Sequence, residues 1–151
     1  MRHEQATSGG WRAAVTWSEP TPEEKALKIE LDRNLGGVWP SVILLMTATP
    51  ALGTAIHVGA AGVSEEVVEG AHGLKYRRGI DPHSVTAILI GAAAGLGKQH
   101  GVEIRIDSGG VSTDTAEGIC RFAAELAATL ITAEGSPALE EALAGCVLNW
   151  V

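Results

Sequence analysis

The stretch GIDPHSVTAILIGAAAG, residues 79–95, decides how the second half of this 151-residue chain folds. Pro82 fixes its own φ and biases the residue before it toward extended backbone, so a helix cannot begin far upstream of it. After the proline and its polar neighbours, small and apolar residues fill almost every position. The stretch therefore predicts a buried helix that ends near Gly97, with His83 or Ser84 near its N-cap.

The start of this helix is the main candidate for a functional site. A helix N-terminus presents free backbone N–H groups and a partial positive charge, which favour a phosphate or a carboxylate. A neutral imidazole there can act as a nucleophile or contact an anion, so His83 and Asp81 are the candidate catalytic residues. The candidate anion contacts are His83, Ser84 and Arg78. The alternative is that His83 is an exposed residue of a capping loop and that Asp81 only caps the helix.

The rest of the second half can be assigned from the spacing of its apolar residues. Strict alternation indicates a strand that faces a core, and an apolar stripe at helical spacing indicates an amphipathic helix. Ser136 followed by Pro137 is typical of a helix start. We predict a strand over 102–107, a turn at 108–110, a helix over 112–127, a strand over 129–135 and a closing helix over 136–150.

The first half is assigned in the same way. Residues 1–10 are polar and glycine-rich, and we expect a flexible tail. WRAAVTW (11–17) has a period of two and predicts a strand. Residues 22–34 fit either a helix that begins at the Thr-Pro-Glu-Glu sequence or a strand, and the alternation of their apolar residues favours the strand. Residues 54–59 predict a further strand.

Two segments of the chain resemble each other. VILLMTATPALG (42–53) and AILIGAAAGLG (87–97) each precede an apolar alternation and then a Gly-Val-Ser sequence. We interpret the pair as an internal duplication of a βαββ unit, in which both segments are helices on one face of a sheet. The alternative is a chance match, because Gly, Ala and Val are common in this chain.

These patterns predict an α/β (α+β) fold: an open-faced sandwich with a mainly antiparallel sheet and helices on one face. We expect residues 11–73 to form an N-terminal βαβ-type unit and residues 74–151 to form a second unit. The two units are expected to share one core, because 151 residues are few for two separate cores.

The second unit carries a family resemblance in four stretches: GIDPHSVTAILIGAAA, VEIRIDSGGVSTDTAEGI, FAAELA and ITAEGSPALEEALAGC. Over residues 74–149 these stretches and the predicted element order resemble HPr, the histidine-containing phosphocarrier protein of the sugar phosphotransferase system. The resemblance implies an antiparallel sheet with helices on one face and a phosphorylated histidine in a Gly-Leu-His-x-Arg-Pro pattern. With Gly79 on the glycine of that pattern, Asp81 stands at the histidine position and His83 at the arginine position, so the phosphotransfer motif is degenerate here.

Composition excludes some classes of function. The formal net charge is −7 and the sequence pI is about 5.1, which argues against a nucleic-acid-binding protein. No charged residue occurs from 34 to 64, but glycines and prolines interrupt this span, and its densest apolar run is far shorter than the about 20 residues of a spanning helix. We expect no membrane segment and no secretory signal, and therefore a cytoplasmic protein.

Other candidate residues are expected to be structural. No His, Asp or Glu pair has the short fixed spacing of a metal site, so we expect no metal and no cofactor. Cys120 and Cys146 lie among apolar residues and are expected to be buried. His57 is expected on a strand, partly buried, and His72 and His100 in glycine-flanked loops.

The function expected from these features is a non-catalytic binding or regulatory module with a protein partner or self-association. An enzyme is disfavoured, because no complete catalytic set is visible. The chain also has four tryptophans, at positions 11, 17, 39 and 150, and such large amphipathic side chains are typical of cores and interfaces. Two alternatives stay open: a phosphoryl acceptor or small enzyme that uses His83 and Asp81, and a domain that binds a small ligand.

Overall fold

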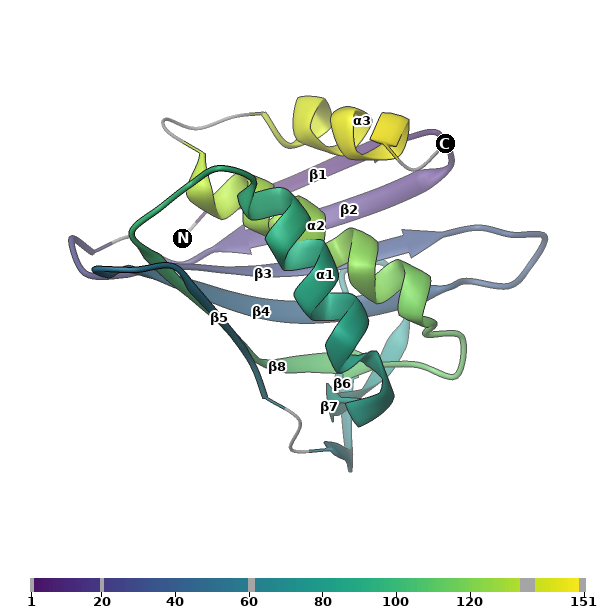
Figure 1. Cartoon of the computed structure of the whole chain (residues 1–151). Helices are drawn as coiled ribbons and strands as arrows, with labels where there is room; N and C mark the ends of the chain where they lie inside the picture. The colour runs from purple at the N-terminus through teal and green to yellow at the C-terminus, as the bar shows by residue number, and fades with distance from the viewer. Residues whose placement is uncertain (1, 20, 60–61, 134–137, 150–151) are drawn as a thin grey trace.

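The computed structural model describes residues 2–19, 21–59, 62–133 and 138–149, and it shows an α+β fold (Figure 1). An open, mostly antiparallel sheet of eight strands packs against three helices. In chain order the elements are β1 (Arg2–Ser8), β2 (Trp11–Trp17), β3 (Lys25–Arg33), β4 (Ser41–Pro50), β5 (Ala55–Val58), β6 (Gly62–Glu69), β7 (Lys75–Ile80), the 3-10 turn η1 (Pro82–Ser84), α1 (Val85–Leu96), β8 (Val102–Val111), α2 (Glu117–Thr132) and α3 (Leu139–Asn149).

The sheet has the strand order β1-β2-β3-β4-β8-β7-β6. Strand β8 pairs with β4 along one side. On its other side, the first half of β8 pairs in parallel with β5, and its last two residues pair antiparallel with β7. One strand therefore holds three others in place, and β4 lies in the middle of the sheet.

The alternation along β3 separates two faces of the sheet. Leu27, Ile29 and Leu31 are buried in the main core, together with the residues of β4 that pair with them and the apolar face of α2. Figure 1 shows α1 and α2 lying over this face. Glu30 and Asp32 point the other way, to what we call the outer face of the sheet.

Close contact between α1 and α2 depends on two glycines. A Cβ atom on Gly91 would overlap the backbone carbonyl oxygen of Arg121, and one on Gly95 would overlap that of Glu125. The helices therefore approach backbone to backbone, which only residues without a side chain allow. Next to them, the rings of Trp11 and Phe122 stack with centroids 4.6 Å apart, which joins β2 to α2.

The β6–β7 hairpin bends over the outer face. Tyr76 of β7 is fully buried, and its Cβ lies only 2.9 Å from the place where a Cβ on Gly110 would be. Its hydroxyl reaches β3 and donates a hydrogen bond to Glu30 Oε2 at 2.7 Å. The turn after β6 also lies over β3, since the backbone N–H of Ala71 donates to Glu30 Oε1 at 2.6 Å.

Several predicted elements are confirmed. Strands occur at 11–17, within 22–34, within 54–59 and at 102–107, and a helix ends next to Gly97, whose φ is +59°. Cys120 and Cys146 are both buried. The prediction for the closing helix start at Ser136 and Pro137 lies outside the described residues.

The prediction of a helix over residues 42–53 is wrong, because residues 41–50 form the central strand β4. Only the first residues of β4, 41–44, are buried on both faces of the sheet, but its apolar run VILLM continues through the exposed Leu45 and so has no period of two. The counterpart of this segment, 87–97, is in α1. One segment is a strand and the other is a helix. The duplication required both segments to be equivalent helices, so the structure does not support it.

Three further predictions are corrected. Residues 2–8 form edge strand β1 and are no flexible tail, because each of them pairs with a residue of β2. Residues 108–110 continue β8 and make no turn. The strand expected over 129–135 is instead the end of α2, at least to Thr132, so the element order inferred with the HPr resemblance lacks this strand.

Candidate functional site

The residues predicted from the sequence lie near one another in the chain but do not form one open site. His83 is exposed in η1, and its backbone N–H donates to Asp81 Oδ1 at 2.9 Å, so Asp81 caps this turn. Ser84 is buried, so its hydroxyl is not open to solvent beside His83. Arg78 lies on β7 with its Nε 3.0 Å from Glu66 Oε2. A phosphoryl-acceptor role for His83 stays a prediction.

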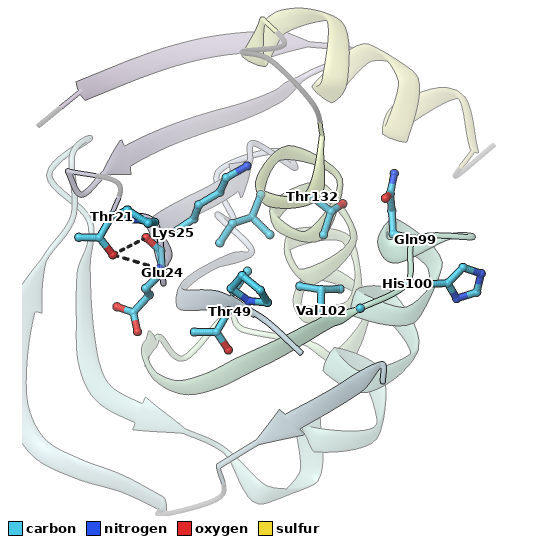
Figure 2. A pocket seen from close by; sticks show the side chains of 13 residues that line it. Thr21, Glu24, Lys25, Thr49, Gln99, His100, Val102 and Thr132 are labelled. Carbon is cyan, nitrogen blue, oxygen red and sulfur yellow. Dashed lines mark hydrogen bonds between the residues drawn. The ribbon is translucent and has the colours of Figure 1, made fainter. Parts of the chain in front are cut away.

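A cavity of about 220 Å³ lies at one end of the sheet (Figure 2). Four segments that are far apart in the sequence meet there: the turn before β3, the end of β4, the connection from α1 to β8, and the end of α2. We call it the end cavity. The end cavity could not be predicted from the sequence, because no single segment carries more than a few of its lining residues.

Hydrogen bonds fix two parts of the rim of the end cavity. In the turn before β3, the Glu24 backbone N–H donates to Thr21 Oγ1 at 3.0 Å, and the Thr21 backbone N–H donates to the Glu24 carbonyl at 3.0 Å. On the other side, the Ala51 backbone N–H donates to the Gly101 carbonyl at 2.8 Å. The rim is therefore formed before any ligand arrives.

The lining of the end cavity combines an apolar floor with a few polar groups. Val102 and Ile131 contribute apolar surface, and Thr49 and Thr132 contribute hydroxyls. Lys25 contributes a positively charged side chain, and its neighbour Glu24 contributes a negatively charged one. Figure 2 shows these polar side chains coming from different elements around one opening, while the imidazole of His100 points away from them. This combination is typical of sites for small molecules.

A second group of polar residues is buried under the β6–β7 hairpin. Asp32 is completely buried, and its Oδ1 accepts a hydrogen bond from Arg12 Nε at 2.6 Å, while its Oδ2 lies 3.2 Å from His72 Nδ1. Glu30 is 3% exposed and accepts from Tyr76 and Ala71. The donor atoms of Glu30, Asp32 and His72 all lie within 4.8 Å of one another. We call these three residues the buried triad; they are the described residues that could hold a metal.

Burial dominates the electrostatics of the groups around these sites. Burial raises the pKa of Tyr76 far above its ordinary value, and the nearby Glu30 carboxylate raises it further, so its hydroxyl remains a hydrogen-bond donor. Burial also raises the pKa of the Cys120 thiol, and that of Cys146 to about 11. These thiols are therefore protonated and unreactive near neutral pH.

Sequence analysis placed His72 in a loop and did not connect it with β3. The available signal was the pair of acidic residues inside the alternation of β3, since a carboxylate on a strand of the sheet centre needs a buried partner. The partner could not be identified, because the hairpin that supplies it bends over the outer face only in three dimensions.

The fold defines an α+β protein with an open, mostly antiparallel sheet. No family model matches the sequence, and no curated protein matches it significantly. Among solved structures, the crystal structure of ttk003000868 from Thermus thermophilus resembles this chain with a TM-score of 0.52 and 14% sequence identity, over 80% of this chain. The match covers 16% of the Thermus chain, and at this identity it shows the fold alone. No helix in the described ranges is both long and apolar enough to cross a membrane.

Proposed function

We propose that this protein binds a small hydroxy or amino carboxylic acid in the end cavity. The observation that carries the proposal is the meeting of an ammonium group, two hydroxyls and an apolar floor in a cavity whose rim is already hydrogen-bonded. Lys25 supplies the positive charge that attracts a carboxylate. The hydroxyls of Thr49 and Thr132, and the carbonyl groups at the end of α2, supply acceptors for a ligand hydroxyl or amine.

The distribution of exposed apolar side chains favours a small ligand over the protein partner expected from the sequence. In the described residues, Val63 and Val67 on β6 line one shallow groove together with Val111. The other exposed large apolar side chains lie on different elements: Leu35 and Val38 between β3 and β4, Leu45 on β4, Leu52 after β4, and Ile90 on α1. Scattered apolar residues are normal on a soluble protein, whereas a docking surface needs a contiguous patch. The end cavity is instead concave and combines both kinds of surface.

The proposal is tested by ligand binding to a matched pair of variants. A panel of small hydroxy and amino carboxylic acids, each with its primary amide, is screened by thermal shift and measured by calorimetry. We expect at least one acid, and not its amide, to raise the Tm of the wild type. Lys25→Met should weaken its binding roughly 10- to 100-fold, the effect of losing a charged hydrogen bond.

Lys28→Met is the control, because Lys28 lies on the same strand, is also exposed, and does not line the end cavity. It should bind the acid as tightly as the wild type. The proposal is wrong if no acid raises the Tm, or if Lys25→Met binds with unchanged affinity.

A further inference from the structure

We propose that the buried triad of Glu30, Asp32 and His72 is a binding site for a zinc-type divalent metal ion. The proposal concerns the opposite side of the sheet from α1 and α2 and does not depend on the end cavity. It rests on the donor set, the charge of the site, the groups that hold the carboxylates, and the access from solvent.

The donor set is one imidazole nitrogen and two carboxylates with their donor atoms within 4.8 Å. Zinc is bound by three such protein ligands at about 2.0–2.2 Å in many sites, with a fourth position for water. Around a tetrahedral ion such ligand atoms lie about 3.4 Å apart, so the atoms that are farthest apart here must come together by movements on the order of 1 Å. His72 is the ligand that can make them, because it lies in the turn after β6, outside the sheet ladder.

The charge of the site calls for a cation. Two carboxylates are buried here, and both lie on β3. Among the described residues, the permanent cation paired with them is Arg12, which bonds to Asp32 Oδ1. Burying a carboxylate that has no counter-charge costs several kcal/mol, so a divalent ion near Glu30 would stabilise the cluster.

The groups around the triad correspond to the outer shell of a metal site. Tyr76 and the Ala71 backbone N–H hold the two oxygens of Glu30, and Arg12 holds one oxygen of Asp32. Each oxygen keeps a further lone pair for a metal ion. Such hydrogen bonds orient ligands, and their loss lowers metal affinity about 10- to 100-fold. Gly70 belongs to the same design, because a Cβ there would overlap the Glu30 carboxylate.

Of the three residues of the buried triad, His72 is the one that solvent reaches. The His72 side chain is 15% exposed, and it lines an open surface depression together with Gln5, Thr7 and Glu140. The two carboxylates are buried and do not line this depression. His72 is therefore at the boundary between solvent and the buried oxygens, where the first contact with an ion would occur. An imidazole in a largely dehydrated site favours zinc-type ions over Mg²⁺, which keeps its water.

The test is a titration of the metal-free protein with Zn²⁺ alone. We expect one equivalent to bind, to raise the Tm and to shift the ring signals of His72 in a histidine NMR spectrum. His72→Ala should weaken binding at least about 100-fold, and Tyr76→Phe about tenfold. His57→Ala is the control for surface histidines, because His57 is exposed on β5 and lies beside Glu103 of β8. This variant should bind Zn²⁺ as tightly as the wild type does.

A second measurement covers the case in which a variant fails to fold. Co²⁺ added to the wild type should give the visible absorption of a low-coordinate nitrogen and oxygen site, and Zn²⁺ should remove it. The proposal is overturned if the wild type gives no such absorption, if the His72 signals do not move, or if folded His72→Ala binds Zn²⁺ as tightly as the wild type.

Discussion

At the scale of single residues, Cys146 shows how burial links the stability of this protein to pH. The thiol is 4% exposed in α3, and burial raises its pKa to about 11 from 9.0. The unfolded chain exposes the thiol to water, so its pKa there is the ordinary one. As the pH rises above 9, the unfolded state loses the proton first, and the free energy of unfolding falls until the pH reaches the folded pKa.

We expect Cys146→Val to remove this pH dependence. Between about pH 9 and pH 11 the free energy of unfolding of the wild type should fall by about 2–3 kcal/mol more than that of the variant. Urea denaturation at several pH values measures the difference. Below pH 8 the free energies of unfolding of the wild type and the variant should change with pH in the same way. The prediction is contradicted if, above pH 9, the free energy of unfolding falls equally steeply with pH in the wild type and the variant.

At the scale of elements, the crossing of α1 and α2 determines which glycines can be replaced. Gly91 and Gly95 lie one helical turn apart on the side of α1 that meets α2. Gly145 lies in α3, is exposed, and would have no atom within 4 Å of an added Cβ. All three positions are helical, so replacement by alanine gains the same intrinsic helix propensity at each. Only the packing differs.

We therefore expect opposite results for Gly91→Ala and Gly145→Ala. The first should lower the free energy of unfolding by about 1–3 kcal/mol, because the methyl group forces the helices apart. The second should raise it by up to about 1 kcal/mol. Chemical denaturation measures both. A stabilised Gly91→Ala would show that α1 and α2 do not approach backbone to backbone.

Elements with one buried face were the ones that sequence could predict. β2, β3 and β8 alternate, and α1 is bounded by Pro82 and Gly97, so local chemistry identified them. β4 could not be assigned, because its apolar run VILLM has no period of two and fits a helix as well as a strand. The end of α2 has the composition of a strand, since Thr, Leu and Ile are common in strands, but burial stabilises the helix there.

The candidate sites could be predicted even less well. Residue spacing points to side chains that are neighbours in the chain, such as Asp81 and His83. The buried triad joins Glu30 and Asp32 to His72 across the sheet, and the end cavity joins four segments. Such sites depend on the strand order and on the bend of the β6–β7 hairpin, which residue spacing does not specify.

At the scale of the whole molecule, one core joins the two halves of the chain. Residues of β2, β3 and β4 are buried in the same cluster as residues of α1, β8, α2 and α3. The stacked rings of Trp11 and Phe122 lie across this boundary. Neither half could bury its apolar face without the other, so the protein is expected to unfold as a single unit.

Two spectroscopic probes can test this. In a Trp150→Phe variant, the remaining tryptophans at 11, 17 and 39 report on the first half, and far-UV circular dichroism reports mainly on the helices of the second half. We expect the two urea transitions to have the same midpoint and the same steepness. Separate midpoints would mean that the halves are independent units, as a duplicated architecture would allow.

The central position of β4 also has a consequence during synthesis. Ribosomes make β4 early, yet its partner β8 begins only at Val102, so one edge of the VILLM segment has no partner while the intervening residues are translated. An uncharged, β-prone apolar segment with an open edge is the kind of sequence that aggregates between nascent chains. The first three strands can form a meander with β4 on the ribosome, but the other edge stays open until β8 emerges. Slow translation through residues 51–101 would therefore lower the yield of folded protein, even though the finished molecule hides that edge completely.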